Sequence, residues 1–299
     1  MSDAKKSKYE VIAERWTDDA HLSRPSERPD FVYHYTDAAG LVGMLASGNV
    51  WATDYRFLND KSEVVHTRNL ARSLLTKRLS SCREELCLKL YNEIIRYQDI
   101  ESTADEFVFS LSEEADDLSQ WRGYAREGRG FTIGFDGSAI YDFGESSEEF
   151  LFIKVRYAHI EQARPIELAL SAMEAQLRLD ANEHSATDEI IEDAARWFDW
   201  LVENRAVTNK HESFRAEKEW RIVGNITPEM VTEQKVRASG DRLVRYTEIP
   251  LAADKLPIKR IGIGPGFTGT EEIHAVRSLC ARWGYEPEIY FANTPYRRL

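Results

Sequence analysis

The chain has 299 residues, of which 42% are hydrophobic, and its formal net charge is −12. This length can bury a core without disulfides or metal ions, and the apolar fraction excludes a disordered chain. The acidic charge argues against a protein that coats nucleic acid, and no apolar run approaches the roughly 20 residues of a membrane helix. There is no signal-peptide pattern at the start, and the three cysteines form no CxxC pair. We therefore expect a cytoplasmic protein that makes no use of a membrane.

Residues 1–30 are expected to form a polar lead-in with a short helix near 8–16 and a proline-bearing linker. Residues 31–299 are expected to form a single α+β domain with a mostly helical insertion at 161–205. Because the predicted strands are dispersed among helices of uneven length, a central mixed or antiparallel sheet with surrounding helices is favoured over a regular doubly wound one. The expected strands are 31–36, 50–55, 107–112, 131–136, 151–157, 219–224, 258–264 and 288–293.

Helix boundaries follow from capping residues. Asp37 and Gly48 are placed to begin and end one helix, and Asp60 and Glu63 have the spacing of a capping box at the start of a helical region that runs to about residue 98. Further helices are expected from about Asp117 to about Glu127 and from Thr268 onward.

Common catalytic signatures are missing from the sequence. It contains no phosphate-binding GxxxxGK[ST] loop, no GxSxG elbow and no HExxH, and IGIGPGF (261–267) lacks the GxGxxG spacing. The seven histidines show no pair at ligand spacing, so no metal site is predicted. Charge is uneven: residues 101–149 carry a net charge of −10, whereas residues 205–299 carry +4 and so could face an anion such as a phosphate.

The run Tyr33-His34-Tyr35-Thr36 combines polar groups with a predicted strand. Alternation places His34 and Thr36 on one face and the two tyrosines on the other. A histidine beside a hydroxyl can hold a sugar hydroxyl or an amide. The alternative is a half-buried, hydrogen-bonded histidine beside core tyrosines.

A second predicted strand carries Ser110 and Ser112 on one face, where two hydroxyls could anchor a ribose or a phosphate. Trp121 and Tyr124 then lie three residues apart on one helix face and could stack on a planar ring. The alternative is a pair of core aromatic residues.

Glu219 begins a third strand and shares a face with Arg221. A carboxylate there could stabilise positive charge opposite His34, and the alternative is an exposed ladder pair of little energetic weight. The segment that contains Asn59, Asp60 and Glu63 is explained by helix capping alone.

The motifs YHYT, LNDKSE, FSLS, QWRGYA, GFTIGF, EKEWRI, IGIGP and NTPYR follow one another over residues 31–298. Their order and spacing resemble a prokaryotic domain-of-unknown-function family, number 2971. That resemblance carries no activity with it.

A more distant resemblance is to the ADP-ribosyltransferase fold, which opens on a strand with His-x-Thr, here His34 and Thr36. The strand that starts at Glu219 resembles the one that carries the catalytic glutamate, and Ser110 and Ser112 resemble the Ser-x-Ser edge of another branch. The resemblance implies a split central sheet with NAD bound in its cleft as substrate.

The same resemblance implies roles for individual residues. His34, Thr36 and Tyr35 would hold the nucleotide with Ser110 and Ser112, and Trp121 or Tyr124 would stack on nicotinamide. Glu219 would stabilise the cationic ribose as the nicotinamide bond breaks, while Arg221 would contact the pyrophosphate. The acceptor would be a macromolecule, protein or nucleic acid, or water, as in a toxin or a phage-defence effector.

Two other functions remain open at this point. One is a non-enzymatic binding or regulatory module on the same fold, in which core side chains fill the cleft. The other is a metal-dependent nuclease or hydrolase that uses Asp60, Glu63, Asp116 and Asp117 as ligands.

Overall fold

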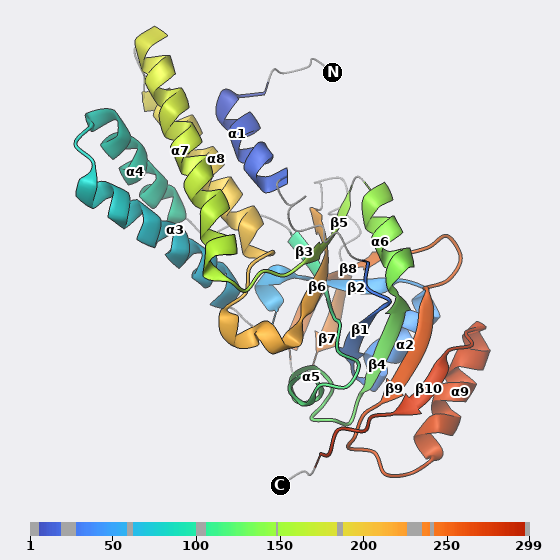
Figure 1. The fold of residues 1–299 in the computed structure, drawn as a ribbon. Coiled ribbons are helices and arrows are strands. Elements are labelled where there is room, and N and C mark those ends of the chain that lie inside the picture. The colour runs from blue at the N-terminus through green and yellow to red at the C-terminus, as the bar shows by residue number, and fades with distance from the viewer. Residues whose placement is uncertain are drawn as a thin grey trace. The chain divides into compact units, whose positions relative to one another are not determined.

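A computed structural model describes residues 6–18, 28–58, 62–99, 106–147, 149–183, 188–225, 235–239 and 242–296 (Figure 1). The chain forms two compact units. The helical unit comprises residues 1–24, 59–104 and 155–213, and the sheet unit comprises residues 25–58, 105–154 and 214–299. The expected single domain with a helical insertion at 161–205 thus differs from this division, because the helical unit also takes in two earlier segments.

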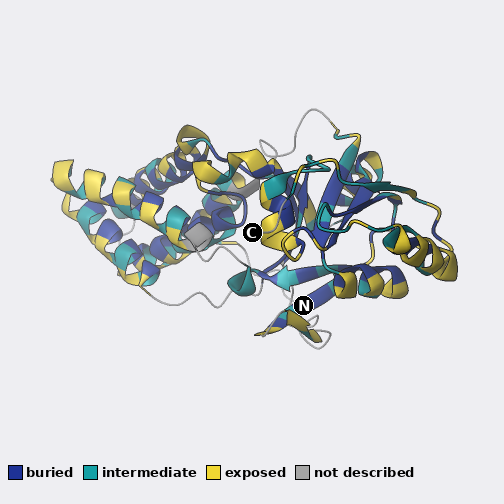
Figure 2. Ribbon diagram, turned by 90° about the horizontal axis from the view of Figure 1, so that it is seen from below, coloured by how far each residue is buried: buried dark blue, intermediate teal, exposed yellow. Residues whose placement is uncertain are grey.

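The described residues of the helical unit form five helices, which pack around a core of their own. They are α1 (Lys8–Asp18), α3 (Ser62–Ser81), α4 (Glu85–Gln98), α7 (His159–Glu183) and α8 (Asp188–Ala206). Each buries one side, as Figure 2 shows, and Leu75, Ile94, Leu170 and Phe198 are fully buried between them. The helical region expected up to residue 98 is two helices, α3 and α4. Asp60 and the side chain of Glu63 lie outside the described residues.

The sheet unit is built on one mixed sheet. Its strand path is β10-β9-β4-β1-β3-β2-β8-β7, and β6 pairs with β3 and β5. Among the strands that the structure describes, the pairings are antiparallel except for the parallel pair of β9 and β10, which confirms the expected α+β class with a mixed sheet. The strands are β1 (Phe31–Thr36), β2 (Val50–Asp54), β3 (Glu106–Ser112), β4 (Phe131–Asp136), β5 (Phe150–Lys154), β6 (Glu219–Asn225), β7 (Lys235–Ser239), β8 (Arg242–Ile249), β9 (Ile258–Ile263) and β10 (Glu288–Phe291).

Local capping positions the helices of this unit, which are α2 (Ala38–Ser47), α5 (Leu118–Tyr124), α6 (Gly137–Ser146) and α9 (Glu271–Trp283), with the 3-10 turns η2 (Tyr55–Phe57) and η3 (Glu212–Glu217). Asp37 accepts the Gly40 N–H at 2.9 Å, and Gly48 ends α2 in the left-handed region at φ 69°, as the sequence predicts. Helix α6 was not predicted, although Asp136 caps it through the Ala139 N–H.

The largest core of the sheet unit lies against one face of the sheet. Val32, Phe109, Ile133 and Trp220 are buried in it together with α2 residues such as Leu41. Strand β3 is buried on both faces, because α5 and the aromatic cluster under it cover part of the second face.

The sheet is split along one edge of β3. On this edge β2 pairs with Phe107 and Val108, whereas β1 reaches only Ser112. None of the strands that the structure describes pairs with residues 109–111 on this side, while β6 pairs with the whole of the opposite edge. The divergence of β1 and β2 therefore leaves a short stretch of β3 backbone for side chains to reach.

Among the described residues, no helix combines the length and the apolar character that crossing a bilayer requires.

Candidate functional site

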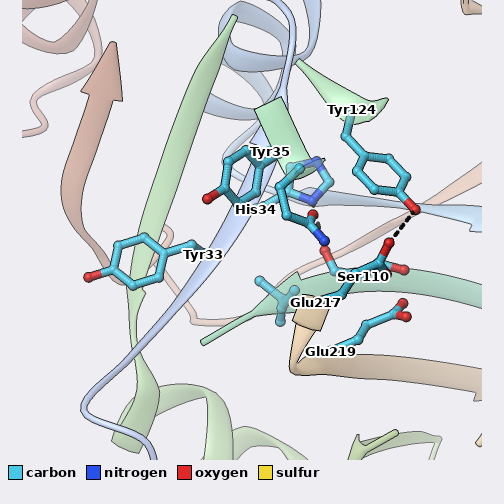
Figure 3. Close-up of a pocket in the computed structure, with 9 residues that line it drawn as sticks. Tyr33, His34, Tyr35, Ser110, Tyr124, Glu217 and Glu219 are labelled. Carbon is cyan, nitrogen blue, oxygen red and sulfur yellow. Dashed lines mark hydrogen bonds between the residues drawn. The ribbon is translucent and has the colours of Figure 1, made fainter. Parts of the chain in front are cut away.

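A pocket lies at this split (Figure 3). Its enclosed part measures about 50 Å³, and it opens to solvent with a total space of about 330 Å³. Residues from β1, β3, α5, η3 and β6 line it: Tyr33, His34, Tyr35, Ser110, Leu111, Gln120, Tyr124, Glu217 and Glu219. Segments that are nearly two hundred positions apart in the sequence thus meet at one place.

Strand register fixes which side chains share the pocket face. Ser112 is opposite Tyr33 on β1 and opposite Glu219 on β6, and Ser110 is opposite Arg221. Directly paired residues of antiparallel strands project to the same side of a sheet. Tyr33, Ser110, Ser112, Glu219 and Arg221 therefore belong to one face, which α5 covers in part.

His34 fills the gap between the diverging strands. Its ring stacks on Phe109 with the centroids 4.3 Å apart, and its Nδ1 lies 2.9 Å from the backbone oxygen of Ser110. Because that oxygen can only accept, Nδ1 carries the proton and Nε2 is left as an acceptor for a ligand hydroxyl. Burial lowers the pKa of His34 from 6.5 to about 4, and the positive charge of Arg237 acts in the same direction. The imidazole is therefore neutral at physiological pH.

The low pKa of His34 predicts that acid destabilises the protein through this residue. The folded pKa lies below the unfolded value, so its contribution to stability is complete above about pH 6.5 and is lost as the pH falls toward 4. Between pH 7.5 and pH 5, we expect the free energy of unfolding of the wild type to fall by about 2 kcal/mol more than that of His34→Gln. Urea unfolding of both proteins at the two pH values measures the difference, and parallel pH profiles would contradict the buried neutral imidazole.

Two carboxylates from consecutive elements reach the pocket. Glu217 ends η3 and Glu219 begins β6, and Lys218 between them has φ 42°, in the left-handed region that is rare for a side chain other than glycine. Ser112 holds this turn, because its hydroxyl donates to the backbone oxygen of Glu217 at 2.7 Å. The hydroxyl of Tyr124 reaches Oε1 of Glu217 at 3.4 Å (Figure 3).

Glu219 is held by a buried arginine. Arg221 donates from Nε to Oε1 at 2.8 Å and from Nη2 to Oε2 at 3.0 Å, a two-point contact that orients the carboxylate. The side chain of Arg221 is 1% exposed and that of Glu219 6%. The glutamate thus presents a fixed negative charge at the edge of the pocket.

Helix α5 is fixed to the pocket by polar anchors. Asp117 caps its first turn, and the hydroxyl of Tyr35 accepts the Asp117 N–H at 2.9 Å while donating to the backbone oxygen of Glu114 at 2.8 Å. Trp121 is fully buried under the helix and donates from Nε1 to Asp116 at 2.7 Å. These contacts set the positions of Gln120 and Tyr124 on the pocket side.

The structure brings together five of the residues singled out in the sequence. His34, Tyr35, Ser110, Tyr124 and Glu219 all line the pocket.

The remaining four do not line it. Thr36 is buried against the start of α2, Ser112 supports the turn at Glu217, Trp121 is enclosed by the core, and Arg221 lies on Glu219. Trp121 is thus not placed to stack on a ligand ring, because its indole contacts Tyr35 edge-on and is 0% exposed.

Four lining residues were given no site role from the sequence: Tyr33, Leu111, Gln120 and Glu217. Glu217 lies two positions before Glu219, and this spacing is a signal that sequence reasoning could have used. Nothing in the local sequence marks Gln120, since its place follows from how α5 packs.

Two of the four acidic residues considered as metal ligands, Asp116 and Asp117, have structural contacts instead. Asp116 accepts hydrogen bonds from Trp121 and from the backbone of Asn293 and Thr294, and Asp117 caps α5. Burial alone would raise the pKa of Asp116, but these bonds hold it below its usual value. Across the described ranges, no cluster of three or more His, Cys, Asp or Glu side chains has the geometry of a metal site.

Comparison with known protein families relates part of the chain to one of them. Residues 120–222 match the model of a family of proteins of unknown function, DUF2971. The resemblance predicted from the sequence motifs is thereby confirmed, and the matched stretch carries Gln120, Tyr124, Glu217 and Glu219 of the pocket. No curated protein and no solved structure matched the chain.

Proposed function

We propose that the pocket binds NAD and breaks its nicotinamide–ribose bond, so that ADP-ribose passes to a macromolecular acceptor or to water. The observation that carries this proposal is the meeting of His34, Tyr124 and Glu219, from three distant segments, around one pocket at the split of the sheet. Cleavage of an N-glycosidic bond to a cationic ring calls for three groups: an aromatic side chain to stack on the ring, a neutral hydrogen-bond acceptor for the ribose hydroxyls, and a fixed carboxylate to stabilise positive charge.

The enclosed part of the pocket can hold only the end of a ligand. It measures about 50 Å³, whereas complete small-molecule sites commonly measure roughly 300–1,000 Å³. The nicotinamide ring would point into it, and the ribose, the diphosphate and the adenosine would lie in the open mouth and over the sheet surface outside.

The reaction is a substitution at the anomeric carbon. The bond from the ribose C1′ to the ring nitrogen breaks, and its electron pair goes to the ring, which leaves as neutral nicotinamide. Positive charge develops on the ribose, and Glu219 stabilises it. A nucleophile then bonds to C1′ and loses its proton to Glu217, the second carboxylate of the pocket. Tyr124 packs against the ring, and Nε2 of His34 accepts a ribose hydroxyl.

Nicotinamide release and thermal stability test the proposal together. We expect NAD to raise the melting temperature of the purified chain and nicotinamide to appear with water, or with proteins and nucleic acids of a bacterial lysate, as acceptor. Glu219→Gln is expected to lower the rate at least about 100-fold, since it removes the charge that stabilises the transition state. Rates are compared at a temperature at which circular dichroism shows the variant folded.

Glu288→Gln is the matched control, because Glu288 is an exposed carboxylate of the same sheet, paired with Arg260. Its rate should equal that of the wild type. If NAD produces no melting shift and no nicotinamide is released, the proposal is overturned. A melting shift without release in any acceptor mixture would support instead a non-enzymatic nucleotide-binding module, which the small enclosed part of the pocket favours.

A further inference from the structure

Arg237 stands out among the arginines of the sheet unit. Its Nη2 donates to the hydroxyl of Thr53 at 2.9 Å, and its guanidinium lies over the rings of Trp51 and Tyr246 at 5.5 and 5.6 Å. No carboxylate in the described part of the chain pairs with it, whereas its neighbour Arg245 pairs with Asp54. The aromatic rings therefore hold a cation in place without neutralising it.

Burial makes this positive charge costly. Desolvation lowers the pKa of Arg237, and its Nε is buried without a hydrogen-bond partner, although Nη1 is not among the buried atoms. The negative charge of Asp37 favours the charged form of Arg237, but Asp37 forms its ion pair with Arg126, so the desolvation of Arg237 is only partly compensated. An anionic group of a bound ligand would compensate the desolvation of Arg237 and would explain why an arginine occupies this position.

The strand register places Arg237 on the pocket face. Its partner Thr53 is opposite Val108 on β3, and Val108 shares a face with Ser110 two residues further on. At about 3.4 Å per residue, Thr53 lies about 7 Å along the sheet from Ser110, whose oxygen binds His34. Thr53 is also the residue at which the pairing of β2 with β3 stops on the side of the split, so it flanks the split opposite β1. The effect of Arg237 on the pKa of His34 agrees with this proximity.

We propose that Arg237 binds a phosphate group of the ligand whose sugar occupies the pocket. The spacing fits a ribose at His34 with its 5′-phosphate carried toward Thr53, and a planar guanidinium with a fixed orientation suits phosphate oxygens. The phosphate role expected for Arg221 thus falls to Arg237, because Arg221 is engaged by Glu219. This inference deepens the proposed function, since it names the charged part of the ligand.

The test compares ligands with and without phosphate. Isothermal titration of the full chain with ADP-ribose, pyrophosphate and nicotinamide riboside is carried out on wild type, Arg237→Met and Arg237→Lys. Methionine keeps a long apolar side chain against Trp51, and Arg242→Met, an exposed change in the next strand, is the control. We expect Arg237→Met to lower the affinity for ADP-ribose at least 10-fold and to leave the affinity for nicotinamide riboside unchanged. The affinity of Arg237→Lys for ADP-ribose should be intermediate, and that of Arg242→Met should equal the wild-type value.

The melting temperature separates binding from folding. Because Arg237→Met removes a desolvated charge, it should be at least as stable as the wild type while binding phosphate ligands less well. Wild-type affinity of Arg237→Met for ADP-ribose, an equal loss for the riboside, or no binding of any phosphate ligand by the wild type would overturn the inference. Arg237-dependent binding of ADP-ribose without nicotinamide release would keep this site and reject the proposed reaction. Nicotinamide release by Arg237→Met with the wild-type KM for NAD would support the proposed reaction and reject the phosphate site at Arg237.

Discussion

Glu219→Gln is expected to lower the free energy of unfolding by about 3–5 kcal/mol, because it removes the carboxylate that binds the buried guanidinium of Arg221 at two points. The pair is almost fully enclosed, with two hydrogen bonds of 2.8 and 3.0 Å. Arg221→Met should lower the free energy of unfolding by a similar amount, because it removes the guanidinium that pairs with the buried carboxylate of Glu219. Urea unfolding at pH 7 measures both changes.

The double variant Glu219→Gln with Arg221→Met distinguishes a buried ion pair from two independent contacts. Once both charges are gone, neither is left without a partner, so the double variant should lose clearly less than the sum of the single changes. Additive losses would mean that the two side chains are not coupled. Glu288→Gln, in an exposed pair, should change stability by less than about 1 kcal/mol.

Trp121→Ala is expected to lower the free energy of unfolding by about 3–5 kcal/mol, the usual cost of removing a large buried aromatic side chain. The indole is 0% exposed, meets Tyr35 edge-on at 4.9 Å and donates to Asp116 at 2.7 Å. Asp116 in turn binds the backbone of Asn293 and Thr294, so the loss of Trp121 also loosens the attachment of the C-terminal segment. Chemical unfolding gives the magnitude.

Trp121→Phe separates packing from hydrogen bonding. It keeps most of the ring volume but leaves the Asp116 carboxylate without one donor, so a loss of about 1–2 kcal/mol is expected. Trp283→Ala on α9, where the indole is 37% exposed, is the control and should cost far less. Equal losses for Trp121→Ala and Trp283→Ala would contradict the buried position of Trp121.

Predictions of the elements succeeded where the signal is local. The caps of α2 at Asp37 and Gly48 and the strands at 31–36 and 131–136 are found as expected, because each depends on a few neighbouring residues. Helix α6 and the β7–β8 hairpin were missed. Helix α6 follows β4 without a break, so a single residue, Asp136, ends one element and caps the next.

The candidate site shows the same division. Residue type and resemblance selected His34, Tyr124 and Glu219, and these side chains do meet. The position of Glu217 depends on a left-handed Lys218, and the contacts of Trp121 and Arg221 depend on burial, none of which can be predicted from residue type alone.

By itself the sequence determined the α+β class, most of the strands and the kind of chemistry its polar residues can support, since propensity, capping and alternation act over a few positions. Only the tertiary structure decided that β1 and β2 part along β3, that Arg221 binds and orients Glu219 and that Arg237 lies on the pocket face. Those facts rest on contacts between residues that are far apart in the chain, up to 184 positions for Thr53 and Arg237, and the register of the strand pairings is set by the packing of the whole sheet.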